Sequence, residues 1–196
     1  KLKTVKKELV KLLVSEKVPC RKMAAILGTV RSFLVALPFL RAFTDMMVQF
    51  VNQHQNWGWD FKGEVPPELK AQLKEVKTLL QTWVGRPFQA SEKVNRELRS
   101  DSSYLAWAGL DLNPGKFVQE FWREKASLHI NVKELEAAIA TVKSLARPKE
   151  KVLLSVDNSV TFYYLTKSGG RKTHFNAILR PFLTWCLEKE ISLSVQ

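Results

Sequence analysis

The stretch Arg99-Ser100-Asp101-Ser102-Ser103, followed by an apolar, strand-like run over 104–112, decides the fold of this chain. Two further acidic residues follow in different settings: Glu134 lies in a helical pattern, and Asp157 ends the strand-like run 152–156. Clustered carboxylates repel one another, and a divalent cation is the usual reason to gather them. This order of strand, helix and strand-end carboxylates predicts a metal-dependent site in the second half of the chain.

The composition is that of a basic, globular protein. The chain has 196 residues, of which 45% are hydrophobic and 26% charged, and its net charge is +12. Residues 1–90 carry 15 Lys/Arg against 7 Asp/Glu, and residues 91–196 carry 16 against 12, so the first half holds most of the excess. A charge of this size favours a polyanionic partner, either nucleic acid or an anionic membrane surface.

The cysteines and the apolar runs bear on the cellular setting. Cys20 and Cys186 have no metal or redox spacing, which predicts two free, buried thiols in a reducing compartment. The most apolar run, 32–40, is broken by Pro38 and is shorter than the roughly 20 apolar residues that span a bilayer. We therefore expect an intracellular location, cytoplasmic or nuclear, and no membrane partner. The chain begins at Lys1 without Met, and we expect it to be part of a longer protein.

The first part of the chain has the pattern of a basic, all-helical domain. Helical spacing of apolar residues predicts helices over 2–14, 21–27, 31–36, 39–54 and 68–83, with a break at Gly28 and a loop over 57–63. From about residue 96 the pattern changes to strands over 96–100, 104–112, 117–122, 152–156 and 191–195. Helices are predicted over 131–146 and 173–189, and 158–166 fits either state. A three-strand meander followed by alternating helices and strands predicts an α/β (α+β overall) fold with a mixed sheet and flanking helices.

These motifs resemble a known family. The second half is similar to the ribonuclease H domain of retroelement reverse transcriptases, nearest to DIRS-like tyrosine-recombinase retrotransposons and more distantly to pararetroviruses. The matching stretches are 100–109, 129–137, 156–160, 168–170, 185–187 and 191–193. The first half resembles the thumb and connection that precede that domain, at 21–28, 36–38 and 83–87. The resemblance implies a thumb-like domain over 1–60, a connecting segment over 61–94 and a ribonuclease H-like domain, C-terminally incomplete, over 95–196.

The resemblance also implies an activity. Asp101, Glu134 and Asp157 would hold two Mg²⁺ ions, with Mn²⁺ as a substitute, and the domain would cleave the RNA strand of RNA–DNA hybrids. A fourth carboxylate is expected shortly after the last strand, beyond Gln196. The partners would be a hybrid or other nucleic acid and the rest of the reverse transcriptase polyprotein. The alternative is a domesticated or truncated, inactive module that binds nucleic acid or protein.

Each acidic residue also has a purely structural interpretation. Asp101 fits a turn or cap, Glu134 fits a solvated helix position with Glu136 as its competitor, and Asp157 fits the cap of the following helix. Asn131 stands three positions before Glu134, the spacing of an N-cap and its N3 residue, so we expect Asn131 to cap that helix. His129 fits a structural role better than a catalytic one.

The remaining candidates concern nucleic-acid binding. Basic and polar residues that suit contact with a phosphate backbone are Lys3, Lys6, Lys7, Lys11, Arg21, Lys22, Arg31, Asn158, Arg171 and Lys172. A solvated helix face explains the lysines of the first half equally well, and a basic turn explains the cluster of Arg171, Lys172 and His174. Trp57, Trp59 and Phe61 can stack on bases, although packing beside the connecting segment is the more common role of such residues. Trp107, Trp122 and Trp185 are expected in the core.

Overall fold

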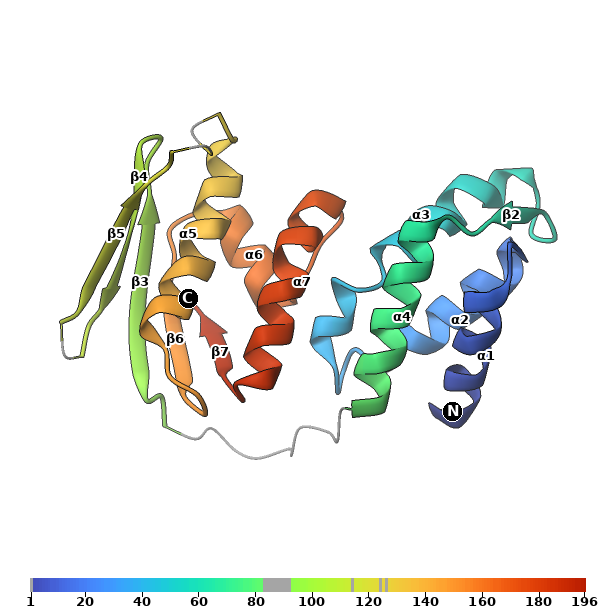
Figure 1. Ribbon diagram of the computed structural model, residues 1–196, viewed down its shortest axis with the longest axis horizontal. Coiled ribbons are helices and arrows are strands. Elements are labelled where there is room, and N and C mark those ends of the chain that lie inside the picture. The colour runs from blue at the N-terminus through green and yellow to red at the C-terminus, as the bar shows by residue number, and fades with distance from the viewer. Residues whose placement is uncertain (1, 83–92, 114, 124, 126) are drawn as a thin grey trace. The chain divides into compact units, whose positions relative to one another are not determined.

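The structure is a computed structural model that describes residues 2–82, 93–113, 115–123, 125 and 127–196 (Figure 1). These residues fall into two compact units. The helical unit lies within 1–88 and takes in 170–176, and the sheet unit lies within 89–169 and 177–196. The predicted segment 83–87, which is part of the connecting segment 61–94, lies outside the described residues.

The helical unit is a cluster of four helices with a small β-ribbon. The helices are α1 (Leu2–Val14), α2 (Cys20–Arg31), α3 (Asp45–His54) and α4 (Pro67–Thr82), with 3-10 turns at Pro38–Arg41 and Gln55–Trp57. Helix α1 packs on α4 and α2, and α2 packs on α3. Strands β1 (Lys17–Pro19) and β2 (Lys62–Glu64) pair antiparallel. Leu9, Leu12, Met23, Leu40, Met47 and Leu73 are fully buried among these elements, so the predicted apolar stripes do form a core.

Three predictions in this unit are wrong. The segment 39–54 is not one helix: a 3-10 turn that Pro38 opens comes first, and α3 begins only at Asp45. Helix α2 does not end before Gly28 but continues to Arg31, and 32–36 is a series of turns rather than a helix. A Cβ on Gly28 would meet no atom within 4 Å, so this glycine is an ordinary helix residue and not a stop. The predicted loop 57–63 contains the start of β2, whose partner β1 lies about 45 residues earlier. Local periodicity cannot reveal a three-residue strand whose partner is so distant.

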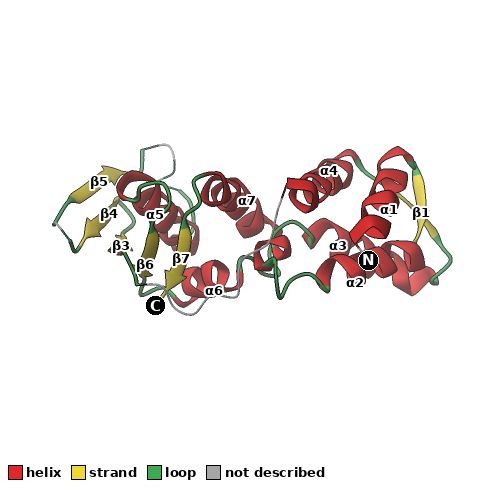
Figure 2. Ribbon diagram, turned by 90° about the horizontal axis from the view of Figure 1, so that it is seen from below, coloured by secondary structure: helices red, strands yellow, loops and turns green. Residues whose placement is uncertain are grey.

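The sheet unit has one mixed five-stranded sheet (Figures 1 and 2). Its strands are β3 (Arg96–Ser102), β4 (Ala106–Asp111), β5 (Phe117–Phe121), β6 (Lys151–Ser155) and β7 (Ser192–Val195), in the order β5-β4-β3-β6-β7. The meander β3-β4-β5 is antiparallel, whereas β6 and β7 run parallel to β3. The helices are α5 (Ile130–Leu145), α6 (Ser159–Lys167) and α7 (Thr173–Glu188). The fold is therefore ribonuclease H-like, as predicted, with a mixed sheet flanked by helices.

The sequence pattern explains why the sheet forms around β3. Burial alternates along β3 and β4, because successive side chains of a strand point to opposite faces. Helix α5 packs on β3 and β4, and its small residues Ala137 and Ala138 are fully buried there. Trp107 and Trp122 are buried against Ala137, which confirms their predicted place in the core, whereas Trp185 is only half-buried.

The ambiguous segment 158–166 is a helix, α6, despite its β-branched and aromatic residues. Asn158 caps it by accepting from the backbone N–H of Thr161 at 2.9 Å, and Ser168 ends it in the left-handed conformation. The capping residue therefore outweighs the β propensity of the segment. Cys20 and Cys186 are both buried and neither forms a disulfide, as predicted.

Candidate metal centre

Asp101 lies on β3, the central strand of the sheet, one residue before its end. The strand position excludes the alternative that Asp101 serves a turn. Its backbone pairs with Ala108 of β4, and its side chain is exposed at the open end of the strand. One carboxylate oxygen, Oδ1, accepts from the N–H of Ser102 at 2.7 Å. The other oxygen has no hydrogen-bond or ion-pair partner among the described residues, so Asp101 is available as a ligand.

Glu134 lies in the second turn of α5 and is only 7% exposed, so it is not the solvated helix residue of the alternative interpretation. The pKa of Glu134 is raised to about 7, mainly by burial and also by the negative charges of Asp157 and Asp101, while a hydrogen bond from the Ser102 backbone opposes the shift. A cation placed among these groups would reverse the effect by favouring the charged carboxylate.

Asp157 follows β6 and precedes α6. The structure gives the capping role to Asn158, one position later, so the alternative interpretation of Asp157 as the cap of α6 is wrong. The reason is geometric: Asn158 has the extended backbone of an N-cap residue, with φ −79° and ψ 116°, and α6 begins directly after it. The Asp157 carboxylate is exposed and free to face the other two acids.

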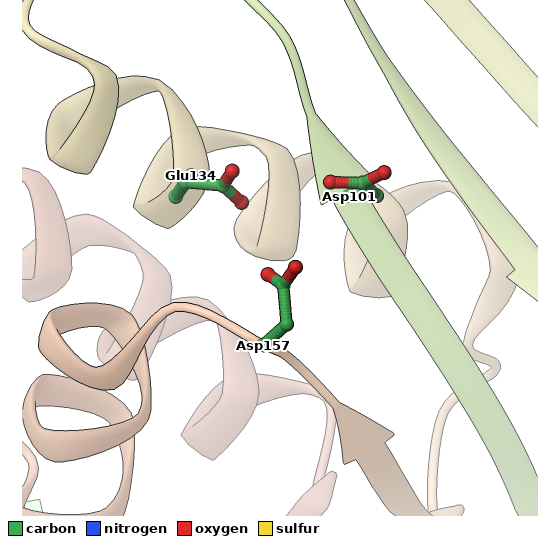
Figure 3. Close-up of side chains that lie close together, drawn as sticks. All are labelled: Asp101, Glu134 and Asp157. Atoms are coloured by element: carbon green, nitrogen blue, oxygen red, sulfur yellow. The ribbon is translucent and has the colours of Figure 1, made fainter.

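The three carboxylates converge from three different elements, and Figure 3 shows them pointing toward one another. One oxygen from each can be chosen so that all three lie within 4.8 Å of one another. Among the described residues, no lysine or arginine forms an ion pair with any of them. Within the described part of the chain, no direct ion pair therefore offsets their mutual repulsion.

The donor set fits a hard divalent cation. Mg²⁺ binds carboxylate oxygens at about 2.1 Å, so oxygens on one ion lie at most about 4.2 Å apart, close to the separation found here. Two ions about 3.5–4 Å apart would spread the ligands slightly more. Asp101, Glu134 and Asp157 can thus hold a metal ion.

A cleft of about 360 Å³ opens beside the carboxylates. It is lined by Arg99 and Asp101 of β3, by Ser155 and Asp157 at the end of β6, and by Ser100 and Val156. Arg99 is exposed and stands two positions before Asp101, on the same face of the strand. The cleft therefore places a cation next to the anionic cluster, where a phosphate group would meet both.

The turn between β3 and β4 is fixed by contacts of Trp122 and Lys133 that the sequence analysis did not predict. Trp122 donates from Nε1 to Ser102 Oγ at 3.2 Å and to the Ser103 carbonyl at 3.1 Å. The fully buried Lys133 donates from Nζ to the Tyr104 carbonyl at 2.7 Å. These bonds hold the end of β3, and therefore Asp101, against α5. In the sequence, the available signal for such a contact was the position of Lys133 beside Leu135 in a helical pattern, because a buried lysine needs a hydrogen-bond partner.

Two other expectations near the site are wrong. Glu136, the competitor of Glu134, lies outside the cluster and pairs with Lys125 at 2.6 Å. Asn131 does not cap α5; His129 does, because its Nδ1 accepts from the N–H of Asn131 at 3.2 Å. Helix α5 begins one residue earlier than expected, which moves the cap to His129. Asn131 instead accepts from Asn158 Nδ2 at 3.0 Å, a bond that links the starts of α5 and α6.

Several of the predicted nucleic-acid contacts are engaged in interactions within the protein. Lys11 and Lys22 pair with Glu8 at 2.7 and 3.5 Å, and Arg21 pairs with Asp60 at 3.2 Å. Asn158 is committed to its cap. Four candidates are exposed and have no ion pair among the described residues: Lys3, Lys7, Arg31 and Arg171. Of the other two lysines, Lys6 is half-buried and Lys172 is exposed.

Comparisons with known proteins leave the family open. No family model matches the chain, and no curated protein matches it. Solved structures that it resembles include the foamy viral protease-reverse transcriptase with an RNA/DNA hybrid, at 11% identity and a TM-score of 0.34, and the same enzyme with double-stranded DNA, at 12% and 0.33. A third, its dRH form with double-stranded DNA, gives 11% and 0.32. The alignments cover 98% of this chain but only 26%, 41% and 34% of those chains. A likeness at this level carries no conclusion about activity.

No helix among the described residues is both long enough and apolar enough to cross a membrane.

Proposed function

We propose that the sheet unit is a ribonuclease H-type endonuclease that hydrolyses the RNA strand of RNA–DNA hybrids. The observation that carries this proposal is the convergence of Asp101, Glu134 and Asp157 on one point of a ribonuclease H-like sheet. Three carboxylates from a central strand, a helix and a neighbouring strand end suit a divalent-metal centre for phosphodiester hydrolysis. We further propose that the chain is the thumb (1–60), connection (61–94) and ribonuclease H (95–196) portion of a retroelement reverse transcriptase.

Each acidic residue has a distinct task in this proposal. When bound, a pair of Mg²⁺ ions supplies an activated water and neutralises charge on the leaving 3′ oxygen. Asp101, on the central strand of the sheet, would hold metal together with Glu134 and Asp157. Glu134 must lose its proton to serve as a ligand, and its raised pKa makes that step depend on pH near neutrality.

The protein around the cluster keeps the ligands in place and presents the substrate. The Ser102 N–H orients Asp101, while Trp122 and Lys133 fix the turn that follows. Arg99 in the adjacent cleft would bind a phosphate oxygen of the strand being cut. A hybrid duplex is distinguished by its shape and by the 2′-hydroxyl groups of its RNA strand.

A substrate comparison tests the proposal. The chain is incubated in Mg²⁺ with an RNA–DNA hybrid labelled on both strands, and separately with double-stranded DNA and double-stranded RNA of the same sequence. We expect cuts in the RNA strand of the hybrid alone. Tight binding of the hybrid without any cleavage, in Mg²⁺ and in Mn²⁺, would instead support the inactive binding module.

A further inference from the structure

A second site lies in the helical unit, separate from the carboxylate cluster. A cavity of about 910 Å³ opens between α3, the β2 strand and the start of α4. Its size falls within the range of pockets that hold small ligands or parts of larger ones. The lining includes aromatic, amide and basic side chains, which are Gln49, Gln53, His54, Trp57, Phe61, Lys62 and Lys70.

The aromatic part of the lining is a preformed ring cluster. Phe61 stacks on His54 with a centroid distance of 5.6 Å, and Trp57 meets Phe61 edge-on at 4.8 Å. Two contacts hold the His54 ring in place. Its Nδ1 lies 2.7 Å from the Phe50 carbonyl oxygen, and Gly63 lies so close that a Cβ there would come within 2.6 Å of the ring. Despite these contacts Trp57 is 67% exposed. Trp57 thus packs against His54 and Phe61, but much of its ring surface remains uncovered and available to a ligand.

The polar part of the lining is free to bind. Gln49 and Gln53 lie one helical turn apart on α3, and both carboxamides line the pocket. Neither side chain has a hydrogen-bond partner among the described residues. A free carboxamide offers one acceptor and two donor hydrogens, which matches the edge of a nucleobase.

The charge of the pocket lining distinguishes an unpaired nucleotide from a proline-rich peptide as the ligand. Lys62 and Lys70 have no ion pair within the described part of the chain, whereas Lys17 is paired with Glu64 at 3.6 Å. Glu16 is the remaining acidic residue of the lining, so the unpaired groups leave a net positive charge. The surroundings are also basic, because residues 1–82 carry 14 Lys/Arg against 7 Asp/Glu. Open aromatic surface, base-like hydrogen-bonding groups and cations at the rim together suit an unpaired nucleotide better than a proline-rich peptide.

We propose that this pocket binds unpaired nucleotides of a single-stranded nucleic acid, with Trp57 stacking on a base, Gln49 and Gln53 contacting base edges, and Lys62 and Lys70 contacting phosphates. Duplex DNA or RNA buries its bases in the stack and cannot enter in this way. The pocket is independent of the hydrolytic site, so this proposal stands even if the sheet unit has no nuclease activity.

The test measures binding of the full chain to fluorescein-labelled ten-nucleotide strands, oligo(dT) and oligo(U), by fluorescence anisotropy in EDTA. The informative variant is Trp57→Ala, and the matched control is Trp59→Ala, because Trp59 is 48% exposed but does not line the pocket. Loss of one stacked base should weaken binding by about 5- to 150-fold in Trp57→Ala. We expect a change of less than about twofold in Trp59→Ala.

A strand with the same phosphates and no bases completes the test. The parent chain should bind this abasic strand more weakly, and Trp57→Ala should cause no further loss on it. Equal losses in the two tryptophan variants, or full affinity for the abasic strand, would overturn the proposal, as would Trp57-dependent binding of a proline-rich peptide in place of the oligonucleotides. The oligo(dT) and oligo(U) arms show whether the pocket prefers DNA or RNA.

Discussion

Gly109 of β4 lies directly against Thr141 of α5: a Cβ atom on the glycine would come within 2.5 Å of Thr141 Oγ1 and 2.7 Å of its Cγ2. Thr141 and Glu134 are seven residues apart, so they lie on the same face of α5. Gly109 stands beside Ala108, which pairs with Asp101 across the strands. The close approach of helix and strand at Gly109 therefore sets how near Glu134 comes to Asp101.

Replacement of this glycine tests the relationship. Gly109→Ala should lower the free energy of unfolding by about 1–3 kcal/mol, because the added methyl group overpacks the interface between α5 and β4. It should also weaken divalent-metal binding by moving Glu134 away from its partners. Urea unfolding and calorimetric titration with Mn²⁺ measure the two effects.

The control for this variant is Gly28→Ala, since Gly28 is helical and has open space around it. This change should leave stability equal or raise it by about 0.5–1 kcal/mol. Addition of Thr141→Ala to Gly109→Ala should recover part of the loss. Equal stability of Gly109→Ala and the parent chain would show that the helix does not depend on this contact.

The titration of Glu134 predicts a pH dependence of metal binding. The pKa of Glu134 is about 7 in the metal-free protein, and a ligand carboxylate must be deprotonated. The apparent affinity for Mg²⁺ or Mn²⁺ should therefore fall by about tenfold between pH 8 and pH 6, with proton release on binding. Calorimetry in buffers of different ionisation enthalpy measures both. A metal affinity that is constant over this range would contradict the assigned role of Glu134.

The titration of Glu134 also predicts how the stability of the metal-free protein depends on pH: it should fall as pH rises, whereas metal affinity should increase. Between about pH 4.5 and pH 7 the folded chain binds more protons at Glu134 than the unfolded chain does, so the free energy of unfolding decreases as pH rises. The contribution of Glu134, on the order of 1–3 kcal/mol, is present at pH 4.5 and lost by pH 8. Urea unfolding in EDTA should show this slope, and Glu134→Gln should remove it. Glu136→Gln, two positions away on the same helix, should leave it unchanged.

Loss of one negative charge should stabilise the metal-free protein. Asp101→Asn relieves its repulsion of Glu134, so we expect the melting temperature in EDTA at pH 8 to rise by a few degrees, for about 1 kcal/mol. The same variant should lose the stabilisation that Mg²⁺ gives the parent chain. A lower melting temperature of Asp101→Asn in EDTA would mean that Asp101 stabilises the metal-free fold and does not destabilise it.

Substitution of Asn158 tests its role as the N-cap of α6. Its side chain caps α6, so Asn158→Ala should lower the free energy of unfolding by about 1 kcal/mol, whereas Asn158→Ser keeps a capping oxygen and should lower it less. Thermal unfolding compares the two. Similar losses in both variants would point to the bond between Asn158 and Asn131 as the more important contact.

The sequence predicted those parts of the fold whose signals are local. The strand pattern around Asp101, the helical pattern around Glu134 and the strand that ends before Asp157 each depend on a few neighbouring residues, and the elements that carry these acids were all confirmed. Caps were misplaced by one or two residues, because whether Asn131 or His129 caps α5 depends on where the backbone first turns. The pairing of β1 with β2 and the bond from Lys133 to Tyr104 join residues 29 or more positions apart, which a pattern along the chain does not reveal.

The most direct test of the central claim is hydrolysis of a labelled RNA–DNA hybrid in Mg²⁺ by four chains: the parent, Asp101→Asn, Glu134→Gln and Glu136→Gln. We predict cleavage of the RNA strand by the parent and by Glu136→Gln, and a loss of at least about a hundredfold in the other two variants, whose folding is checked by thermal unfolding. Equal cleavage by all four chains would show that the nuclease activity comes from elsewhere. No cleavage by a parent chain that Mg²⁺ measurably stabilises would contradict the claim that this cluster is a hydrolytic centre.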